Sequence, residues 1–318
     1  ALPIYVRGWD CRNDDNDPMD DHGHGTNVAG TIGAVGDNGI GVAGVSWTVT
    51  LLPIKFLGSN ATGTDADAIE AILYAASFED AAGNKIVRIT NNSCGRGRRS
   101  NALQDAIQAS GALFIASAGN SGSSQKLYPA GYNLDNIISV AATDDDDLLA
   151  SFSSYGASWV DVGAPGVGIL SADIGNAYGV RDGTSMAAAH VSGAAALVMA
   201  ALPGLTNAEV KGQILDTVAE IQERHDAVKE LERKLLELHQ IFLDMSVLVE
   251  AQGEMLDNIE NQVSKSVDYV HRGQVSLIQA RKYQKSSRKW MCCSLICVLM
   301  IACAILLPVL QPWASGGA

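Results

Sequence analysis

The character of the sequence changes near Val218, and this change limits what the chain can fold into. Gly and Ala are concentrated in residues 1–200, whereas Glu, Lys, Leu and Gln dominate residues 219–289. An uncharged apolar stretch then follows. The chain has 318 residues and a net charge of −13, which argues against nucleic-acid binding as its main activity. We therefore expect two parts with different folds.

The apolar stretch near the C-terminus has the length of a membrane-spanning helix. Residues 291–310 contain no charged side chain, and about 20 such residues cross a hydrocarbon core of about 30 Å. Trp290 and Trp313 flank this stretch, as expected at a membrane interface. Basic residues precede it and none follows: Arg281, Lys282, Lys285, Arg288 and Lys289. This bias predicts a single-pass membrane protein, anchored C-terminally, with its N-terminal bulk facing the cytosol. The alternative is a buried core helix.

The spacing of the six cysteines indicates neither a disulfide framework nor a metal site. Two of the six, Cys11 and Cys94, lie in the first part, and the other four lie in the apolar stretch. Their spacing matches neither a metal site nor a disulfide-rich domain, which favours a reducing compartment. We expect no secretory signal in residues 1–7, since they lack a charged segment followed by a long apolar run.

Upstream of the apolar stretch, the sequence repeats like a coiled coil. The positions of the repeat are Val228, Leu231, Leu235, Leu238, Phe242, Met245, Val249, Gln252, Leu256, Ile259, Val263, Ser266, Val270, Gly273, Leu277 and Ala280, here called the seam. Their spacing alternates between three and four residues, which keeps one stripe facing a partner helix. One helix cannot bury this stripe alone, so partner helices are implied. The polar Gln252 either fixes register and partner choice or is a tolerated defect.

Two segments of this repeat carry a family resemblance. Glu220–Met245 and Val249–Val270 resemble the SNARE motif of syntaxins, the Qa class, with the apolar stretch as their membrane anchor. The resemblance covers residues 212–310. It implies that Gln252 joins a central layer with one arginine and two glutamines from partner helices. It also implies a four-helix bundle that docks vesicles and fuses membranes, and a basic segment that contacts anionic lipid heads.

The first part alternates strand and helix patterns. Short runs rich in Val, Ile, Leu and Thr predict strands at 48–57, 85–90, 112–117 and 136–142. Helical patterns occupy 65–82 and 101–110, and small and apolar residues at 184–201 predict a buried helix. This alternation is typical of an α/β domain with a parallel sheet.

Three short segments in this part suggest acyl-transfer chemistry. His22–Gly30 places a histidine at a Gly-rich helix start, and Ala116–Asn120 ends an apolar strand with an amide donor. Gly183–Ala188 places Ser185 at a helix N-terminus. There, the helix dipole and free N–H groups favour the negative charge that develops during acyl transfer.

In this order, the three segments resemble the subtilisin-like serine peptidases, over residues 8–215. The resemblance implies an α/β fold and peptide or protein substrates. It assigns Ser185 as nucleophile, His24 as general base and Asn120 as oxyanion donor. It assigns pairing with the substrate backbone to three consecutive residues, Ser93, Cys94 and Gly95.

The sequence departs from this family at the third triad member. The family carries its aspartate in an Asp-Thr-Gly or Asp-Ser-Gly turn after an early strand, and residues 1–23 contain no such tripeptide. We therefore expect an incomplete domain without its first strand, and weak or no proteolysis. The acidic residues before His24 are expected to form a solvated loop. We expect no cofactor, although clustered carboxylates also suit a structural calcium ion.

These patterns predict four segments. Residues 1–215 form the subtilase-like domain, 216–289 the SNARE coiled-coil helix, 290–311 the transmembrane anchor and 312–318 a short tail. Three functional hypotheses follow: a SNARE protein with a poorly folded appendage, a membrane-tethered serine endopeptidase, or a fusion or gene-model artefact without a coherent activity.

Overall fold

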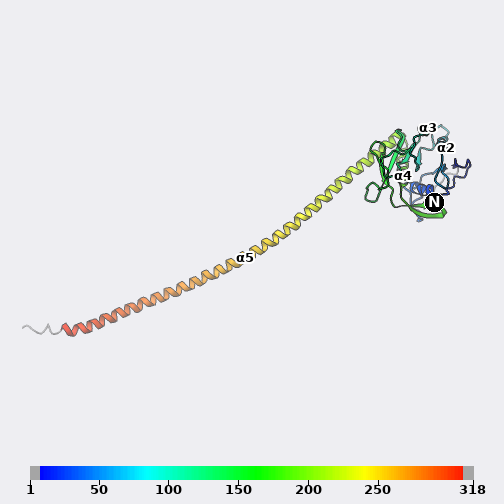
Figure 1. Ribbon diagram of the computed structural model, residues 1–318. Coiled ribbons are helices and arrows are strands. Elements are labelled where there is room, and N and C mark those ends of the chain that lie inside the picture. The colour runs from blue at the N-terminus through cyan, green and yellow to red at the C-terminus, as the bar shows by residue number, and fades with distance from the viewer. Residues whose placement is uncertain (1–7, 311–318) are drawn as a thin grey trace, which may run out of the picture. The chain divides into compact units, whose positions relative to one another are not determined.

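The computed structural model describes residues 8–310, and the chain divides into two compact units, Ala1–Ala227 and Val228–Ala318. The first unit combines strands with the helices α1 to α4, of which α2, α3 and α4 are labelled in Figure 1. The second unit consists of the helix α5, which begins within the first unit. The expected tail 312–318 and the flanking Trp313 lie outside the described residues.

A parallel sheet of four strands forms the centre of the first unit. In spatial order its strands are β3 (Ile89–Asn92), β4 (Leu113–Ser117), β5 (Ile137–Thr143) and β6 (Val162–Pro165). Every residue of β4 is buried, because β4 has a strand on each side and helices on both faces. The predicted α/β fold with a parallel sheet is confirmed.

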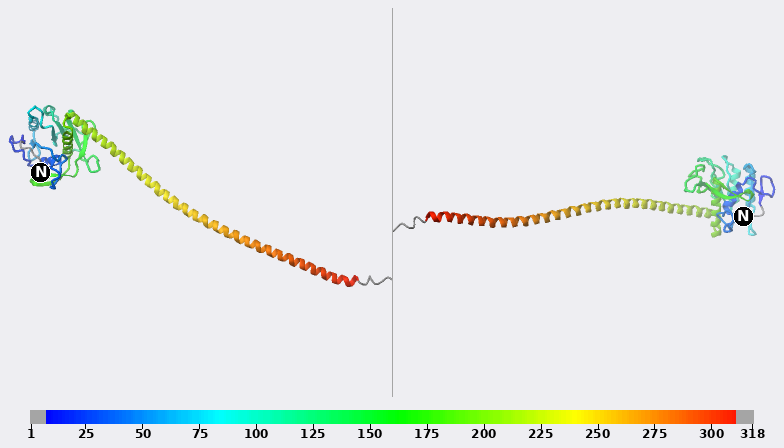
Figure 2. Two further views of the ribbon diagram at one scale, coloured as in Figure 1. Left: turned by 180° about the vertical axis from the view of Figure 1, so that it is seen from behind. Right: turned by 90° about the horizontal axis from the view of Figure 1, so that it is seen from below.

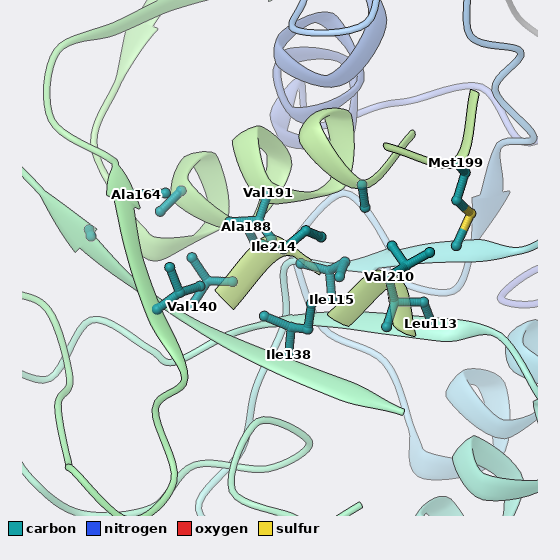
Figure 3. Close-up of a cluster of buried hydrophobic side chains, with 14 of the residues drawn as sticks. Leu113, Ile115, Ile138, Val140, Ala164, Ala188, Val191, Met199, Val210 and Ile214 are labelled. Atoms are coloured by element: carbon teal, nitrogen blue, oxygen red, sulfur yellow. The ribbon is translucent and has the colours of Figure 1, made fainter. Parts of the chain in front are cut away.

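Alternate residues of β4 face two different helical layers. Phe114 and Ala116 pack in one cluster with α2 (Asp65–Ala76) and α3 (Asn101–Ser110). Leu113 and Ile115 pack in another cluster under α4 (Thr184–Ala201). Figure 3 shows side chains of α4 and of the sheet meeting in this second cluster. The many alanines of α4 allow this close approach.

The start of α5 (Asn207–Leu310) belongs to the core of the first unit. Val210 is fully buried and Ile214 nearly so, within the cluster under α4. Thr206 and Glu209 form the reciprocal hydrogen bonds of a capping box, which explains why the helix begins there. The amino group of Lys211 donates to the carbonyl of Ile137 on β5.

A second, smaller pair of parallel strands lies apart from the main sheet. β1 (Trp9–Asp10) pairs with β2 (Ile54–Lys55), and neither pairs with β3. An antiparallel hairpin of β7 (Ile169–Asp173) and β8 (Ala177–Arg181), joined by the short 3₁₀ helix Ile174–Asn176, forms a third sheet.

The β7–β8 hairpin packs against α1 (His24–Gly33). The hydroxyl of Ser171 donates to the carbonyl of Asn27 over 2.8 Å. The Nδ2 of Asn27 donates in turn to the carbonyl of Gly179 over 3.2 Å. The hairpin therefore holds the helix that begins with His24.

Some sequence expectations differ from the structure. The helix expected over 65–82 ends at Ala76, because Asp80 accepts hydrogen bonds from the N–H groups of Ala82 and Asn84 and turns the chain. Asp10, expected in a solvated loop, lies in β1 and is only 1% exposed.

The second unit leaves its apolar side chains uncovered. Figure 2 shows α5 as one uninterrupted helix. Seam residues are widely exposed, from 46% at Leu238 to 72% at Leu277. Within residues 8–310, two helices are long and apolar enough to cross a membrane, α4 and α5. The α4 window is 56% buried in the first unit, whereas none of the α5 window is buried.

Candidate functional site

Ser185 lies in the first turn of α4, where backbone donors are free. The residue before the helix, Gly183, adopts φ 154° and ψ 157° and provides no side-chain cap. Within residues 8–310, the N–H of Ser185 has no hydrogen-bond partner. The first N–H groups of a helix form a weak positive pole, so this N–H is suited to an anionic oxygen.

The Asn120 amide is fixed in an orientation suited to the same oxygen. Its Oδ1 accepts from both the N–H and the hydroxyl of Thr184, each over 2.9 Å. Its Nδ2 is therefore directed elsewhere, close to Gly183, where an added Cβ would lie 3.2 Å from it. Thr184 is 1% exposed and also accepts from the N–H of Gly119. The structure thus provides two N–H donors beside Ser185, one from the backbone and one from Asn120.

The predicted substrate-binding segment runs beside the predicted nucleophile. The hydroxyl of Ser93 donates to the Ser185 carbonyl over 2.9 Å, and the Ser185 hydroxyl donates to the Ser93 carbonyl over 3.4 Å. The adjacent Cys94 is a thiol, because burial raises its pKa to about 11. Beyond Gly95, Arg96 and Tyr128 exchange two backbone hydrogen bonds of 2.8 Å. This bridge fixes the end of the segment beside Tyr128.

His24 begins α1, which packs against α4. Val28 of α1 and Met186 of α4 share one buried cluster. Among residues 8–310, the His24 ring makes no hydrogen bond, to Ser185 or to a carboxylate. Burial lowers the pKa of His24, and the positive charge of Arg181 lowers it further. The neutral form of the His24 ring is therefore favoured, and no carboxylate holds the ring in place in the described chain.

Arg181 is a neighbour of His24 that sequence reasoning missed. Its guanidinium pairs with Asp173 over 3.1 Å and lies against Gly23, where an added Cβ would be 2.8 Å from Nη2. Its Nε is buried and has no partner in the part of the chain that the structure describes. A cation here opposes protonation of His24, and protonation is the step a general base must undergo. In the sequence, only the position of Arg181 four residues before Ser185 indicated that it lies near the site.

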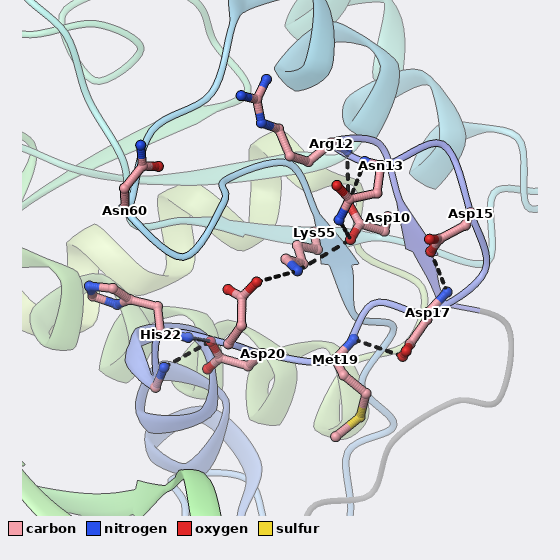
Figure 4. A network of polar contacts seen from close by, with 12 residues as sticks. Asp10, Arg12, Asn13, Asp15, Asp17, Met19, Asp20, His22, Lys55 and Asn60 are labelled. Carbon is pink, nitrogen blue, oxygen red and sulfur yellow. Dashed lines mark hydrogen bonds and ion pairs between the residues drawn. The ribbon is translucent and has the colours of Figure 1, made fainter.

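The acidic loop before His24 uses its carboxylates to shape the backbone (Figure 4). Asp20 accepts hydrogen bonds from the N–H groups of His22, Gly23 and Thr26 and from the Thr26 hydroxyl. Burial opposes the charge on Asp20, but these donors outweigh burial and lower its pKa to about 2. Asp20 thereby fixes the turn that leads into α1.

Asp10 has a similar role at the other end of this loop. It accepts from the N–H groups of Arg12 and Asn13 and from the Asn13 side chain. Lys55 on β2 pairs with Asp10 at 3.3 Å and with Asp21 at 2.8 Å. Within residues 8–310, no group of three acidic, His or Cys side chains is placed to hold a metal ion. The carboxylates serve turns and ion pairs in this structure.

Comparison with known proteins identifies the first unit. The sequence profile of the subtilase family matches residues 3–242. The thermophilic serine proteinase of Bacillus sp. (strain AK1) is 41% identical over 219 residues, which cover 68% of this chain and 52% of that protein. The chain belongs to the subtilase family. Subtilisin BL of Lederbergia lenta is 40% identical over 206 residues, covering 64% of this chain and 72% of that protein.

A solved structure has the same fold as this subtilase. The crystal structure of a cold adapted subtilisin-like serine proteinase superposes with a TM-score of 0.58 at 34% identity. The match covers 66% of this chain and 72% of that one.

The second unit matches a different family. The profile of the SNARE domain matches residues 219–297. Syntaxin-132 of Arabidopsis thaliana is 59% identical over 108 residues, covering 34% of this chain and 36% of that protein. This subtilase therefore also carries a syntaxin-type SNARE domain. The chain spans about half of the strain AK1 proteinase and about a third of syntaxin-132.

Proposed function

We propose that this chain acts as a membrane-anchored SNARE protein whose subtilase unit is a serine peptidase of low activity. The main support for the SNARE role is the exposed seam of α5. Its residues Leu231, Leu235 and Leu256 are 61%, 64% and 65% exposed. A helix that leaves so many large apolar side chains in water requires partners to cover them. Three further helices complete a four-helix bundle.

Gln252 supplies the register of this bundle. It lies in the seam between Val249 and Leu256, both more than 60% exposed. Once partners cover the seam, the Gln252 amide needs hydrogen-bonding groups at the same level, because an unpaired buried amide is unfavourable. One arginine and two glutamines from the partners meet this need and disfavour other alignments.

Mixing the full chain, in detergent micelles, with one arginine-layer and two glutamine-layer SNARE helices tests this role. We expect a four-helix complex that resists SDS. Gln252→Arg introduces a second buried arginine and lowers complex stability by about 3–5 kcal/mol. Changing the partner arginine to glutamine restores it. Gln262, which lies off the seam, is the matched control site, and Gln262→Arg leaves the complex unchanged. If no complex forms with any such helices, the SNARE role is wrong.

Residues 216–289 supply the bundle helix and residues 290–311 the anchor. The basic residues before the anchor support a cytosolic location for the N-terminal bulk. Zippering toward the anchors of opposing membranes draws the two bilayers together. Limited proteolysis of chain inserted into sealed vesicles tests the topology. Complete digestion of residues before 290 from the outside is expected, and protection of the subtilase unit contradicts this orientation.

Peptidase activity is the second candidate function. It is supported by the Asn120 amide, whose orientation is fixed by its hydrogen bonds with Thr184. In this reaction the Ser185 hydroxyl attacks a peptide carbonyl while His24 takes its proton. The resulting oxyanion accepts hydrogen bonds from Asn120 Nδ2 and the Ser185 N–H. Residues 93–95 pair with the extended substrate backbone. Proton transfer is the weak step, because His24 has a cationic neighbour in Arg181 and no carboxylate partner in the described residues.

Labelling the full chain with a fluorophosphonate tests this activity. We expect slow labelling at Ser185, located by mass spectrometry and abolished in Ser185→Ala. The rate should lie far below that of subtilisin BL, because the positive charge of Arg181 opposes protonation of His24 and no carboxylate in the described residues orients its ring. Ser124→Ala, at an exposed serine in the loop after Asn120, is the control and leaves labelling unchanged. No label on Ser185 after prolonged incubation excludes the peptidase.

A further inference from the structure

A group of basic residues follows directly on the predicted substrate-binding segment. After Gly95 the chain carries Arg96, Arg98 and Arg99, here called the arginine run, in a protein whose net charge is −13. Arg98 and Arg99 are exposed, and the Arg96 side chain is 39% exposed. A concentration of positive charge on an otherwise acidic chain attracts ligands of the opposite charge.

Most of the positive charge of the arginine run is free to meet a ligand. Arg96 pairs with Asp65 at the start of α2, which neutralises one of the three charges. The Arg99 guanidinium donates through Nε and Nη2 to the uncharged Oε1 of Gln104, over 3.2 and 2.8 Å. Within residues 8–310, the Arg98 guanidinium has no partner, and only its carbonyl accepts a hydrogen bond. Arg98 and Arg99 therefore keep their charges.

The backbone of the arginine run is held at both ends by tyrosines. Arg96 and Tyr128 exchange two backbone hydrogen bonds of 2.8 Å. At the other end, the N–H of Ser100 donates to the Tyr132 hydroxyl over 3.0 Å, and this hydroxyl donates to the Ser100 carbonyl over 2.7 Å. The Arg96 Nε also donates to the Arg98 carbonyl over 2.9 Å. The run is therefore fixed relative to the substrate-binding segment that it follows.

A bound peptide reaches the arginine run with its acyl half. In the proposed reaction the amine half leaves toward His24, which returns the proton to it. His24 begins α1, which packs on the β7–β8 hairpin, whereas the segment 93–95 continues β3. Ser93 is hydrogen-bonded to Ser185, so the attacked residue lies level with Ser93. The residues before it extend along 93–95 and reach Arg96 after about three residues.

We propose that the arginine run selects peptides with acidic residues about four to six positions before the bond that is cleaved. Carboxylates at those positions meet Arg98 and Arg99, and a guanidinium binds a carboxylate through two parallel hydrogen bonds. A peptide fits this surface better than an anionic lipid headgroup does, because the run directly continues the segment that pairs with a peptide backbone. The inference rests on the proposed peptidase function and names its substrate class.

Peptide aldehydes test this preference in a fixed register. The Ser185 oxygen adds to the aldehyde carbon, and the hydroxyl proton ends on the aldehyde oxygen, which gives a reversible hemiacetal. We compare acetyl-Glu-Asp-Glu-Ala-Ala-Leu aldehyde with acetyl-Gln-Asn-Gln-Ala-Ala-Leu aldehyde on the full chain in neutral detergent micelles. The measured quantity is the aldehyde concentration that halves fluorophosphonate labelling of Ser185. The acidic aldehyde should need a concentration about tenfold lower, as expected for two exposed ion pairs.

Salt and charge removal should both reduce this difference. Raising NaCl from about 20 to about 500 mM should bring the two aldehydes to within about twofold of each other. Arg98→Gln combined with Arg99→Gln should do the same at low salt, by weakening the acidic aldehyde alone, while an unchanged Tm reports an intact fold. Lys85→Gln removes a positive charge from an exposed turn of the same unit and is the matched control. It should keep the tenfold difference.

The outcomes separate the acidic preference from the peptidase activity. Equal inhibition by the two aldehydes, with Ser185 labelled, overturns the preference and leaves the peptidase in place. An equal loss of preference in Lys85→Gln also overturns it, because net charge then explains the effect. So does tighter binding of short-chain phosphatidylserine than of the acidic peptide, which assigns the run to a lipid headgroup.

Absence of labelling at Ser185 excludes the peptidase, and binding then decides the role of the arginine run. Fluorescein-labelled amides of the same two peptides are titrated against the Ser185→Ala chain and followed by anisotropy. A tenfold preference for the acidic peptide, lost in the double arginine variant, supports a site for acidic peptides. Equal binding of the two peptides, or no binding of either, overturns the proposal.

Discussion

The two units of this chain place their apolar side chains in opposite environments. In the first unit Ile115, Ile138 and Val140 are fully buried between sheet and helices. In the second unit Leu235, Phe242 and Val263 are more than half exposed. The first unit carries its own core, and under the proposed function the second acquires one only when partner helices bind. The same residue types therefore contribute to stability in one unit and to association in the other.

The largest expected effect comes from truncating the core of the first unit. Ile115→Ala removes a side chain of 0% exposure from β4 and should lower the free energy of unfolding by about 3–4 kcal/mol. Urea denaturation of the full chain in detergent measures this loss. Leu256→Ala, at a position 65% exposed in α5, should leave the same transition unchanged. Equal effects of the two substitutions would remove the distinction between the units.

The second prediction is that Leu256→Ala, neutral in the free chain, becomes destabilising once SNARE partners are bound. Leu256→Ala should destabilise the assembled SNARE complex by about 2–3 kcal/mol, because partner helices then bury this side chain. Thermal dissociation of the complex measures the change. Glu254→Ala, off the seam, is the control and should alter dissociation by less than about 0.5 kcal/mol. A complex indifferent to Leu256→Ala would mean that the seam does not face the partners.

A third prediction concerns the point along α5 at which its apolar side chains change from buried to exposed. Val210 is 0% exposed and Val218 is 40% exposed, although they lie only two turns apart on one helix. Val210→Ala should cost the first unit about 1.5–2 kcal/mol, and Val218→Ala less than about 0.5 kcal/mol. Urea denaturation of both variants provides the comparison. Similar costs at the two sites would place Val218 in the core as well.

The smallest effect concerns the turn that leads into His24. The folded-state pKa of Asp20, about 2, lies below the ordinary value of 3.8, so its charged form stabilises the fold above pH 4. This stability is lost as the pH falls from about 4 to about 2. Asp20→Asn should cost about 1 kcal/mol at pH 7, after allowance for partial exposure, and remove this part of the acid dependence. Asp145→Asn, in an exposed turn, should preserve both stability and its pH dependence.

Much of the fold of the first unit could be predicted from periodicity and turn residues. The helices expected at 101–110 and 184–201 coincide with α3 and α4, and the strands expected at 112–117 and 136–142 contain β4 and nearly all of β5. These elements are buried, so their apolar patterns are strong. The strand expected over 48–57 shortens to β2, because only one of its edges is paired in the described chain.

Residues of the candidate site could be predicted only where they belong to short sequence motifs. The motifs around Ser185, Asn120 and Ser93 named residues that the structure brings together. The Arg181–Asp173 pair beside Gly23 was not predictable, since it depends on a hairpin that folds back onto α1. The burial of Asp10 was also missed, because its partner Lys55 is distant in sequence. Roles for these residues in catalysis stay predictions until Ser185 is labelled.

Hydrogen exchange of the full chain, with and without the three SNARE partner helices, tests the contrast between the units most directly. We predict slow exchange in residues 113–117 and 137–143 under both conditions. Exchange in residues 228–280 should be fast in the free chain and slow by at least about a hundredfold once partners are added. Slow exchange of 228–280 without partners, or no change on adding them, would contradict the account that this helix gains its core only from other chains.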